Sequence, residues 1–392
     1  MRILSIICVM VCLCTAKASQ AQVLPDFQEV ERRSIELYLK GAWSALLEYG
    51  RMSVTNGHDY LNIRLRMGYA SFMTGRYAEA IRQYERALWF DSYNTTAHEF
   101  LYFSRKYMGQ PDIAAFHAPY LTQATRTSEH LDRPAWTTAG AEISRKHTDI
   151  TDRGDHSYGH LTGTLRLGHR VQVQQLISGF GQLIFEPLLA SAAGGASIRV
   201  NQTGLYNRTR VNLDRNRQLV GAIHYLSTSF GSLRYHNLLA MAGMKWYGDY
   251  VTIQADGMIG RMTDTAMQQG NLTMQYMPKG NMDLYGFTVI SVHHQTKTSI
   301  NIRQVLGGRI LTNTWLEGHA TLGSFRNFAE SDGLYMYNSI DENRLKAGLT
   351  AYRLFRGGFI VQAGYTMEQR RKFGWNDHYF QHSITGGITW RQ

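Results

Sequence analysis

The sequence has few cysteines, few prolines and no long apolar run beyond its first residues. Its three cysteines, Cys8, Cys12 and Cys14, all lie at the start of a chain of 392 residues. The rest of the chain therefore has no disulfide and no thiolate metal site. The 6 prolines exclude a collagen-like chain. After residue 14 no run approaches the roughly 20 apolar residues with which a helix spans a bilayer, which excludes a helical membrane protein.

Charged residues are also scarce. They make up 18% of the chain, against about 25% in typical soluble domains. Hydrophobic residues reach 44% and aromatic residues 12%, with 23 Tyr and 37 Gly. This composition excludes a disordered chain and a coiled coil, and it favours extended strands over helices.

The first 21 residues have the layout of a secretory signal peptide. Met1 and Arg2 form a short positive start, and an apolar stretch runs from Ile3 to Leu13. Small residues in Ser19-Gln20-Ala21 predict cleavage before Gln22. We therefore expect a signal peptide over residues 1–21. The alternative is an uncleaved anchor, for which the apolar stretch is short.

Residues 27–120 repeat with a fixed period. Gly41, Gly75 and Gly109 are each 34 residues apart. The unit resembles a tetratricopeptide repeat, a pair of antiparallel helices that recurs every 34 residues. The alternative is three amphipathic helix pairs whose spacing is accidental. Such units bury their apolar faces by stacking, which leaves a concave face for a peptide or a periplasmic partner protein.

The middle unit contains the residues on which this resemblance rests. We expect its small residues to lie where two helices touch, its tyrosines to fill the space between them, and Gly75 to end the first helix in a left-handed conformation. Arg64 departs from the pattern where Trp is usual, and Ser92 departs where Pro closes the repeat. The residues expected to pack within the repeat are Gly68, Gly75, Tyr77, Ala80, Tyr84 and Ala87.

A change of pattern divides the chain into two domains. Residues 121–135 are polar and lose the helical period, so we expect a linker there. In residues 136–392 apolar side chains recur at every second position, for example from Val251 to Ile259, which places them on one face of a strand. Short turns are expected at sites that include Gly307-Gly308, and longer connections at sites that include 263–269 and 327–343.

Two all-β folds fit this alternation. A soluble sandwich would alternate as well, but strands of about ten residues after a signal peptide favour a closed transmembrane barrel, because the bilayer forbids unpaired backbone groups. Counting turns gives 14 strands, with 12 as the alternative because residues 186–216 are irregular. The predicted fold is thus a helical tetratricopeptide-like domain followed by an antiparallel β-barrel.

Charged residues on the predicted inward faces are the candidate functional residues. Their signs are mixed, so we expect ion pairs that cross the lumen and a narrow or occluded pore. A structural role and a place on a conduction path are both open for them. The candidate lumen charges are Arg166, Asp256, Arg303, Glu317, Lys346 and Glu368, with His319 beside them.

The barrel region is basic, with 26 Lys and Arg against 17 Asp and Glu. Its surplus predicts attraction for anions such as lipopolysaccharide phosphates or an exported anionic polymer, while the simpler interpretation is solvated surface loops. Nucleic acid is not an expected partner. We expect two basic groups in external loops: Arg208, Arg210, Arg215 and Arg217 with Asp214, and Arg370, Arg371 and Lys372.

Motifs of catalysis are missing. His98-Glu99 lacks the second His of a zinc-protease helix, and the sequence has no nucleophile elbow or phosphate loop. We therefore expect no enzyme, no cofactor and no metal site. The many Ser and His residues leave a lipid-modifying enzyme as a weak alternative.

The order of a signal peptide, repeats and a barrel resembles the YaiO-type outer-membrane β-barrel proteins. Exporters of exopolysaccharide and surface-lipoprotein assembly modifiers share this layout. The resemblance implies a Gram-negative outer-membrane protein whose repeat domain lies in the periplasm. Two functions remain open: export or surface delivery of a polymer or protein, and a non-conducting barrel that anchors a periplasmic docking scaffold.

Overall fold

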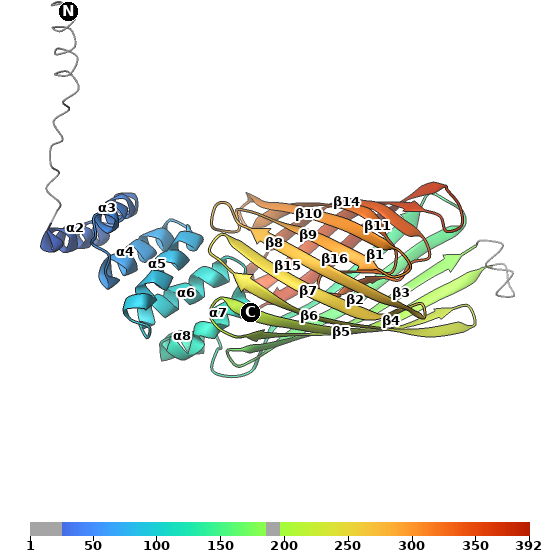
Figure 1. Ribbon diagram of the computed structural model, residues 1–392, viewed down its shortest axis with the longest axis horizontal. Helices are drawn as coiled ribbons and strands as arrows, with labels where there is room; N and C mark the ends of the chain where they lie inside the picture. Colours follow the sequence, from blue (N-terminus) through green and yellow to red (C-terminus); the bar gives the residue numbers. More distant parts are fainter. Residues whose placement is uncertain (1–25, 186–196) are drawn as a thin grey trace, which may run out of the picture.

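The protein consists of a helical region followed by a closed β-barrel (Figure 1). The structure, a computed structural model, describes residues 26–185 and 197–392. The predicted signal peptide lies outside these residues. None of the helices in the described part of the chain has the length and hydrophobicity to cross a bilayer.

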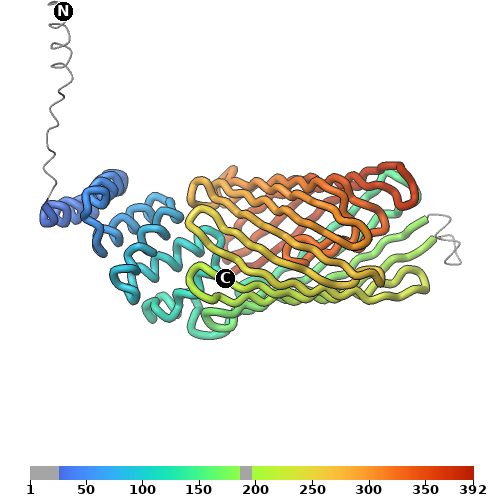
Figure 2. The backbone as a smooth tube through the Cα atoms, in the orientation of Figure 1, coloured from blue at the N-terminus to red at the C-terminus, as the bar shows by residue number. Residues whose placement is uncertain are grey.

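The helical region extends from residue 27 to residue 128. Gly41, Gly75 and Gly109 follow α2, α4 and α6 with φ angles of +65°, +70° and +69°, the left-handed conformation that glycine adopts at low cost. Consecutive helices therefore turn back on one another, as the backbone trace in Figure 2 shows. The helices are α2 (Phe27–Leu39), α3 (Trp43–Thr55), α4 (Leu61–Met73), α5 (Tyr77–Phe90), α6 (Thr95–Tyr107), α7 (Pro111–Ala114), the 3₁₀ helix η1 (Ala115–Tyr120) and α8 (Gln123–Ser128).

The core of this region lies between α4, α5 and α6. Tyr84 of α5 is fully buried and stacks on Phe100 of α6 with ring centroids 5.4 Å apart. Its ring also lies against Gly68 of α4, where an added Cβ would be 2.7 Å from the ring. Ala80 and Ala87 are fully buried beside it. Small residues thus allow the helices to approach closely around one large side chain.

The barrel has 14 antiparallel strands and closes between β1 and β16. The predicted order of a helical region and an antiparallel barrel is confirmed, and so is the count of 14 strands. Two further strands, β12 (Phe328–Glu330) and β13 (Tyr335–Tyr337), pair only with each other. The barrel strands are β1 (Ala135–Thr148), β2 (Arg153–Leu167), β3 (Val171–Ile184), β4 (Ile198–Asn212), β5 (Arg217–Phe230), β6 (Leu233–Tyr247), β7 (Val251–Met262), β8 (Thr265–Tyr276), β9 (Leu284–His294), β10 (Thr298–Leu311), β11 (Thr314–Phe325), β14 (Glu342–Leu354), β15 (Phe359–Arg371) and β16 (His378–Arg391).

Two predicted connections are wrong. Gly307-Gly308 lies inside β10 and not in a turn, because a Cβ on Gly307 would be 2.3 Å from the ring of Tyr285, so glycine here makes room for a neighbouring strand's side chain. The connection expected at 263–269 consists of Thr263 and Asp264 alone. Both have positive φ, the geometry of a two-residue hairpin turn.

The outer surface of the barrel is apolar. Ile143 is 71% exposed, Leu161 66% and Ile384 72%. Soluble proteins seldom expose a continuous apolar surface of this kind, whereas transmembrane barrels present one to lipid. Other exposed members are Ile177, Leu205, Ile223, Leu238, Ile259, Leu306, Leu322 and Leu349.

The helical region packs against one end of the barrel, which also holds the C-terminus (Figure 1). We refer to this as the helix end and to the opposite end as the far end. Ala78 of α5 donates its backbone N–H to the carbonyl of Gly280 at 3.1 Å. Met277 and Tyr285 of the barrel belong to the same apolar cluster as the core of α5 and α6. The two parts of the chain therefore share a core.

Candidate functional site

The lumen of the barrel is occupied by part of the chain itself. The connection between β11 and β14 folds inward, and we call residues 327–341, which include β12 and β13, the inner loop. Its polar groups bond to strands around the whole circumference, so it crosses the lumen. These contacts are made by Arg153 of β2, Gln202 and Arg208 of β4, His224 and Thr228 of β5, Gln254 of β7, Gln269 of β8, Arg303 of β10, Lys346 of β14 and Tyr379 of β16.

Glu330 of the inner loop lies between two cations of the barrel wall. Its carboxylate is 3.0 Å from Nζ of Lys346 and 3.5 Å from Nη1 of Arg303. The side chain of Glu330 is 4% exposed, so the pair is shielded from water. Tyr337 of the same loop donates a hydrogen bond to Glu330 at 3.1 Å. A buried charge needs such partners to be tolerated.

Asp332 occupies the tip of the inner loop. Its carboxylate is 2.5 Å from Nη1 of Arg208, and Gln254 donates to it at 2.8 Å. Asp332 has a φ of +60°, and Ser331 before it +55°. These residues hold an uncommon conformation because the surrounding contacts fix them.

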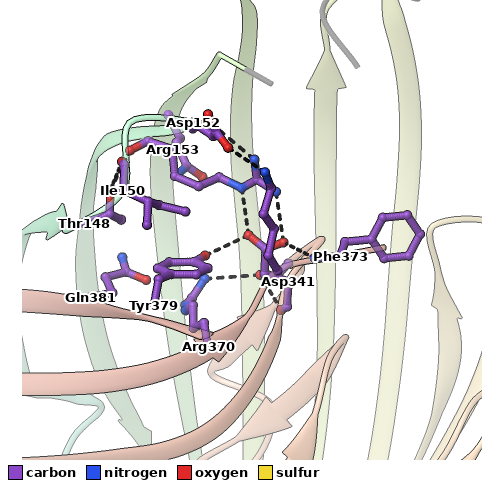
Figure 3. Close-up of polar contacts among 12 residues, drawn as sticks. Thr148, Ile150, Asp152, Arg153, Asp341, Arg370, Phe373, Tyr379 and Gln381 are labelled. Atoms are coloured by element: carbon purple, nitrogen blue, oxygen red, sulfur yellow. Dashed lines mark hydrogen bonds and ion pairs between the residues drawn. The ribbon is translucent and has the colours of Figure 1, made fainter. Parts of the chain in front are cut away.

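Asp341 fixes the other end of the inner loop (Figure 3). Arg153 donates to its two carboxylate oxygens from Nε at 2.7 Å and from Nη2 at 3.0 Å. The hydroxyl of Tyr379 and the backbone N–H of Phe373 donate to it at 2.7 Å and 2.9 Å. Asp341, Arg153 and Tyr379 are all buried. A bidentate, buried pair of this geometry is among the stronger ion pairs that a protein makes.

One side of the inner loop is apolar. Ala329, Leu334 and Met336 pack on a patch of the barrel wall that faces the lumen. The inner loop is therefore held by a small core of its own as well as by ion pairs. This wall patch consists of Leu176, Tyr206, Val220, Ala222, Leu239, Met241, Met258, Met262 and Met267.

A cavity of about 520 Å³ remains beside the inner loop. Its wall carries a second charged group, in which Glu368 is 3.2 Å from Lys146 and 2.6 Å from Arg370. Buried polar atoms without a hydrogen-bond partner also face it, namely Nδ1 of His156 and Nε2 of His319. The cavity has both polar and apolar walls and is large enough for a small solute.

The helical region lies over part of the helix end. Asp112 of α7 forms an ion pair with Arg210 of β4, the second residue after Arg208 on the same face. Arg105 of α6 is 1% exposed and donates to the carbonyl of Gly248 and to Oδ1 of Asn216, both at 2.9 Å. The lumen is thus partly covered by α6 and α7 on the side of β4 to β7 and crossed further in by the inner loop.

The six predicted lumen charges fall into separate groups. Arg303 and Lys346 meet at Glu330, and Glu368 lies in the charged group on the cavity wall. Glu317 and Asp256 have neutral partners, Tyr285 at 3.0 Å and Asn271 at 2.6 Å respectively. Arg166 donates to the carbonyl of His130 close to the helical region.

The expectation of external loops for the basic groups is wrong for several residues. Arg208 and Arg210 lie in β4 and Arg370 in β15, and all three make ion pairs inside the barrel. Arg215 and Arg217 lie at the helix end, at the connection from β4 to β5. The alternation of the sequence could have predicted that Arg208 and Arg210 face the lumen together, because residues two apart on a strand lie on the same face.

Sequence reasoning also missed the inner-loop carboxylates, since nothing in a local pattern shows that a connection turns inward. The described residues contain no group of three or more His, Cys, Asp and Glu placed to bind a metal ion.

Comparisons with known proteins find similarity to solved structures alone. No family model matches the chain, and no curated protein matches it. Among solved structures, a deletion mutant of the TodX monoaromatic hydrocarbon channel has a TM-score of 0.47 at 6% identity, covering 66% of this chain and 90% of that one. A FadL homologue of Pseudomonas aeruginosa has 0.44 at 8%, covering 66% and 90%. A bacterial polysaccharide outer membrane secretin has 0.37 at 11%, covering 67% and 99%.

Proposed function

We propose that the protein is a gated conduit of the Gram-negative outer membrane, taking part in export or surface delivery of a polymer or protein. The closed barrel and its apolar outer surface support a place in a lipid bilayer, with outer-membrane lipid and lipopolysaccharide around it. The proposal assigns no catalytic chemistry to the chain.

One observation carries the proposal: the lumen is crossed by a segment that is not part of the barrel wall. The inner loop is held by ion pairs, hydrogen bonds and apolar packing, whereas the barrel strands pair with each other without it. Moving it would leave the barrel strands paired and open the lumen beside α6 and α7.

The helical region is proposed to lie in the periplasm as a tetratricopeptide-like docking module. The helical region lies at the helix end of the barrel. In this orientation the strand turns at that end are the periplasmic turns of the barrel. A periplasmic protein bound to the helices could loosen the contacts of Asp112 and Arg105 and so open that end. We propose this role for the chain as a YaiO-type outer-membrane β-barrel protein.

Swelling of liposomes tests the proposed function. The full chain and a variant whose residues 327–341 are replaced by a short Gly-Ser linker are reconstituted, and entry of small sugars is followed. Only the shortened variant should admit them rapidly. Heat-dependent migration in gels serves as the control that both barrels are folded.

The competing function is a sealed docking barrel. Two features favour this function: α6 and α7 lie over part of the helix end, and the inner loop crosses the lumen. If the shortened variant is folded and still admits no sugar, the conduit is wrong and the docking role stands.

A further inference from the structure

The charges of the inner loop and the barrel wall are matched to each other. Residues 327–341 contain three acidic residues, Glu330, Asp332 and Asp341, and no Lys or Arg. Every one of the three carboxylates is paired with a cation of the barrel wall: Arg303 and Lys346, Arg208, and Arg153.

Three carboxylates of the wall are satisfied differently, whereas a fourth, Glu368, is paired with Lys146 and Arg370 of the wall itself. Glu142 accepts hydrogen bonds from Gln362 at 2.6 Å and from Tyr335 at 3.3 Å. Asp256 and Glu317 likewise accept from Asn271 and Tyr285. Neutral donors thus serve these three wall acids and Glu368 has cations of its own, so that Arg153, Arg208, Arg303 and Lys346 pair with the acids of the inner loop.

These cations follow the length of the lumen. Arg153 is the first residue of β2 at the far end, and Arg303 and Lys346 lie several residues inside β10 and β14. Arg208 lies deeper, in the part of β4 nearest the helix end. Beyond it Arg210 is paired with Asp112 of the helical region. The positive charges therefore form a series from one end of the lumen to the other.

We propose that this series of cations is the binding path for an anionic cargo, and that the inner-loop carboxylates occupy it in the resting state as a built-in substitute. This rests on the proposed conduit function. The ligand class is a chain that bears carboxylate, phosphate or sulfate groups. Such a chain can replace the carboxylates one pair at a time, so the wall cations are not left buried and unpaired.

The pairing also gives the lumen a preference among solutes. A purely apolar plug would leave a wall without one. With the inner loop moved away, four wall cations lose their carboxylate partners and outnumber Glu142, Asp256 and Glu317, the wall acids whose partners are neutral. A surplus of positive charge in a narrow space raises the local concentration of anions.

Ion selectivity of the shortened-loop variant tests this inference in planar bilayers with a KCl gradient. We expect a preference of up to about tenfold for chloride over potassium, because the four released wall cations outnumber the three wall acids that have no cationic partner. In the same background, R153Q, R208Q, R303Q and K346Q together should abolish the preference while conductance remains. R145Q is the matched control, because Arg145 is ion-paired with Asp155 outside the lumen, at an exposed site.

A second measurement uses a polymer probe. Oligogalacturonate, a carboxylate chain, should block the current of the shortened variant, and dextran of equal length should not. Block by phosphate-bearing polyphosphate or sulfate-bearing dextran sulfate, tested alongside, identifies which anionic group binds best. The fourfold variant should need at least about tenfold more oligogalacturonate for the same block, as expected if a cationic wall enriches anions.

A third variant retains the full loop, so that folding of the shortened chain is not the only route to an answer. E330Q, D332N and D341N together should raise the open probability, whereas D155N should not. Conductance without anion preference, or equal block by dextran, overturns the inference and leaves the conduit standing. A folded, silent shortened variant overturns the conduit and the inference together.

Discussion

At the residue scale, Asp341 is the side chain on which the closed state most depends. It joins the inner loop to β2 and β16 through Arg153 and Tyr379. Because removing one partner of a buried pair leaves the other charge uncompensated, D341N should destabilise the docked loop by about 3 kcal/mol. Limited proteolysis within residues 327–341 should then be faster by more than about a hundredfold. Unchanged cleavage would show that Asp341 does not hold the loop.

A pair of glycines gives a second test at this scale. A Cβ on Gly68 would be 2.7 Å from the rigid ring of Tyr84, and a Cβ on Gly50 would be 2.7 Å from the flexible side chain of Met67. G68A should therefore cost about 1–3 kcal/mol of unfolding free energy, whereas in G50A the methionine moves aside and the cost is smaller. Urea unfolding followed by circular dichroism measures both. Equal costs would contradict this packing.

The pair of His98 and His117 should make the helical region sensitive to acid. Their Nδ1 atoms are 2.8 Å apart, and burial holds the pKa of each below its usual range, with Arg215 a further cause. Since the unfolded chain then binds more protons below about pH 6.5, stability is full above that pH and is lost as the pH falls.

The expected slope is about 1.4 kcal/mol per pH unit for each proton taken up. Urea unfolding of the full chain between pH 7 and pH 5 measures it. H117Q should lower the slope. A free energy that does not change over this range would exclude a neutral buried pair.

At the element scale, α6 connects the helical region to the barrel. Arg105 donates to Gly248 and Asn216 in two barrel turns while fully shielded from water. R105M should cost about 3 kcal/mol, because two acceptors lose a buried, charged donor. Hydrogen exchange at residues 248–250 should rise. R51M is the control, since the pair of Arg51 with Glu79 is exposed and worth at most about 1 kcal/mol.

The elements themselves were largely predictable from the sequence. The period of Gly41, Gly75 and Gly109 predicted where helices end, and alternation predicted the strands. Gly307-Gly308 misled, because glycine serves a turn and a close approach equally well and a local pattern does not distinguish the two. The start of β8 was placed too late for a different reason, since Thr263 and Asp264 suffice for the turn.

The candidate site was less predictable than the fold. Alternation placed Arg303 and Lys346 on one face, but their partner Glu330 comes from a connection, where no period applies. Arg208 was placed in an external loop instead of in β4, because its strand follows an irregular stretch. The strand residue that each acid of the inner loop contacts is determined by how the barrel closes. Closure depends on strands that are far apart in the sequence, so a short stretch of sequence does not reveal it.

At the scale of the whole molecule, two separate segments restrict one lumen. The helices cover part of the helix end through Asp112 and Arg105, and the inner loop crosses the interior through Glu330, Asp332 and Asp341. The two segments bring acids to neighbouring residues of β4, Arg208 and Arg210. Opening one segment therefore changes the charge beside the other, so the two closures are expected to be coupled.

The most direct test of this account is the single-channel conductance of the purified chain, compared with the variant that lacks residues 327–341. The account predicts that the full chain is almost silent with brief openings and that the shortened variant conducts steadily. Steady, equal conductance of both proteins would contradict it, because the inner loop would then not close the lumen.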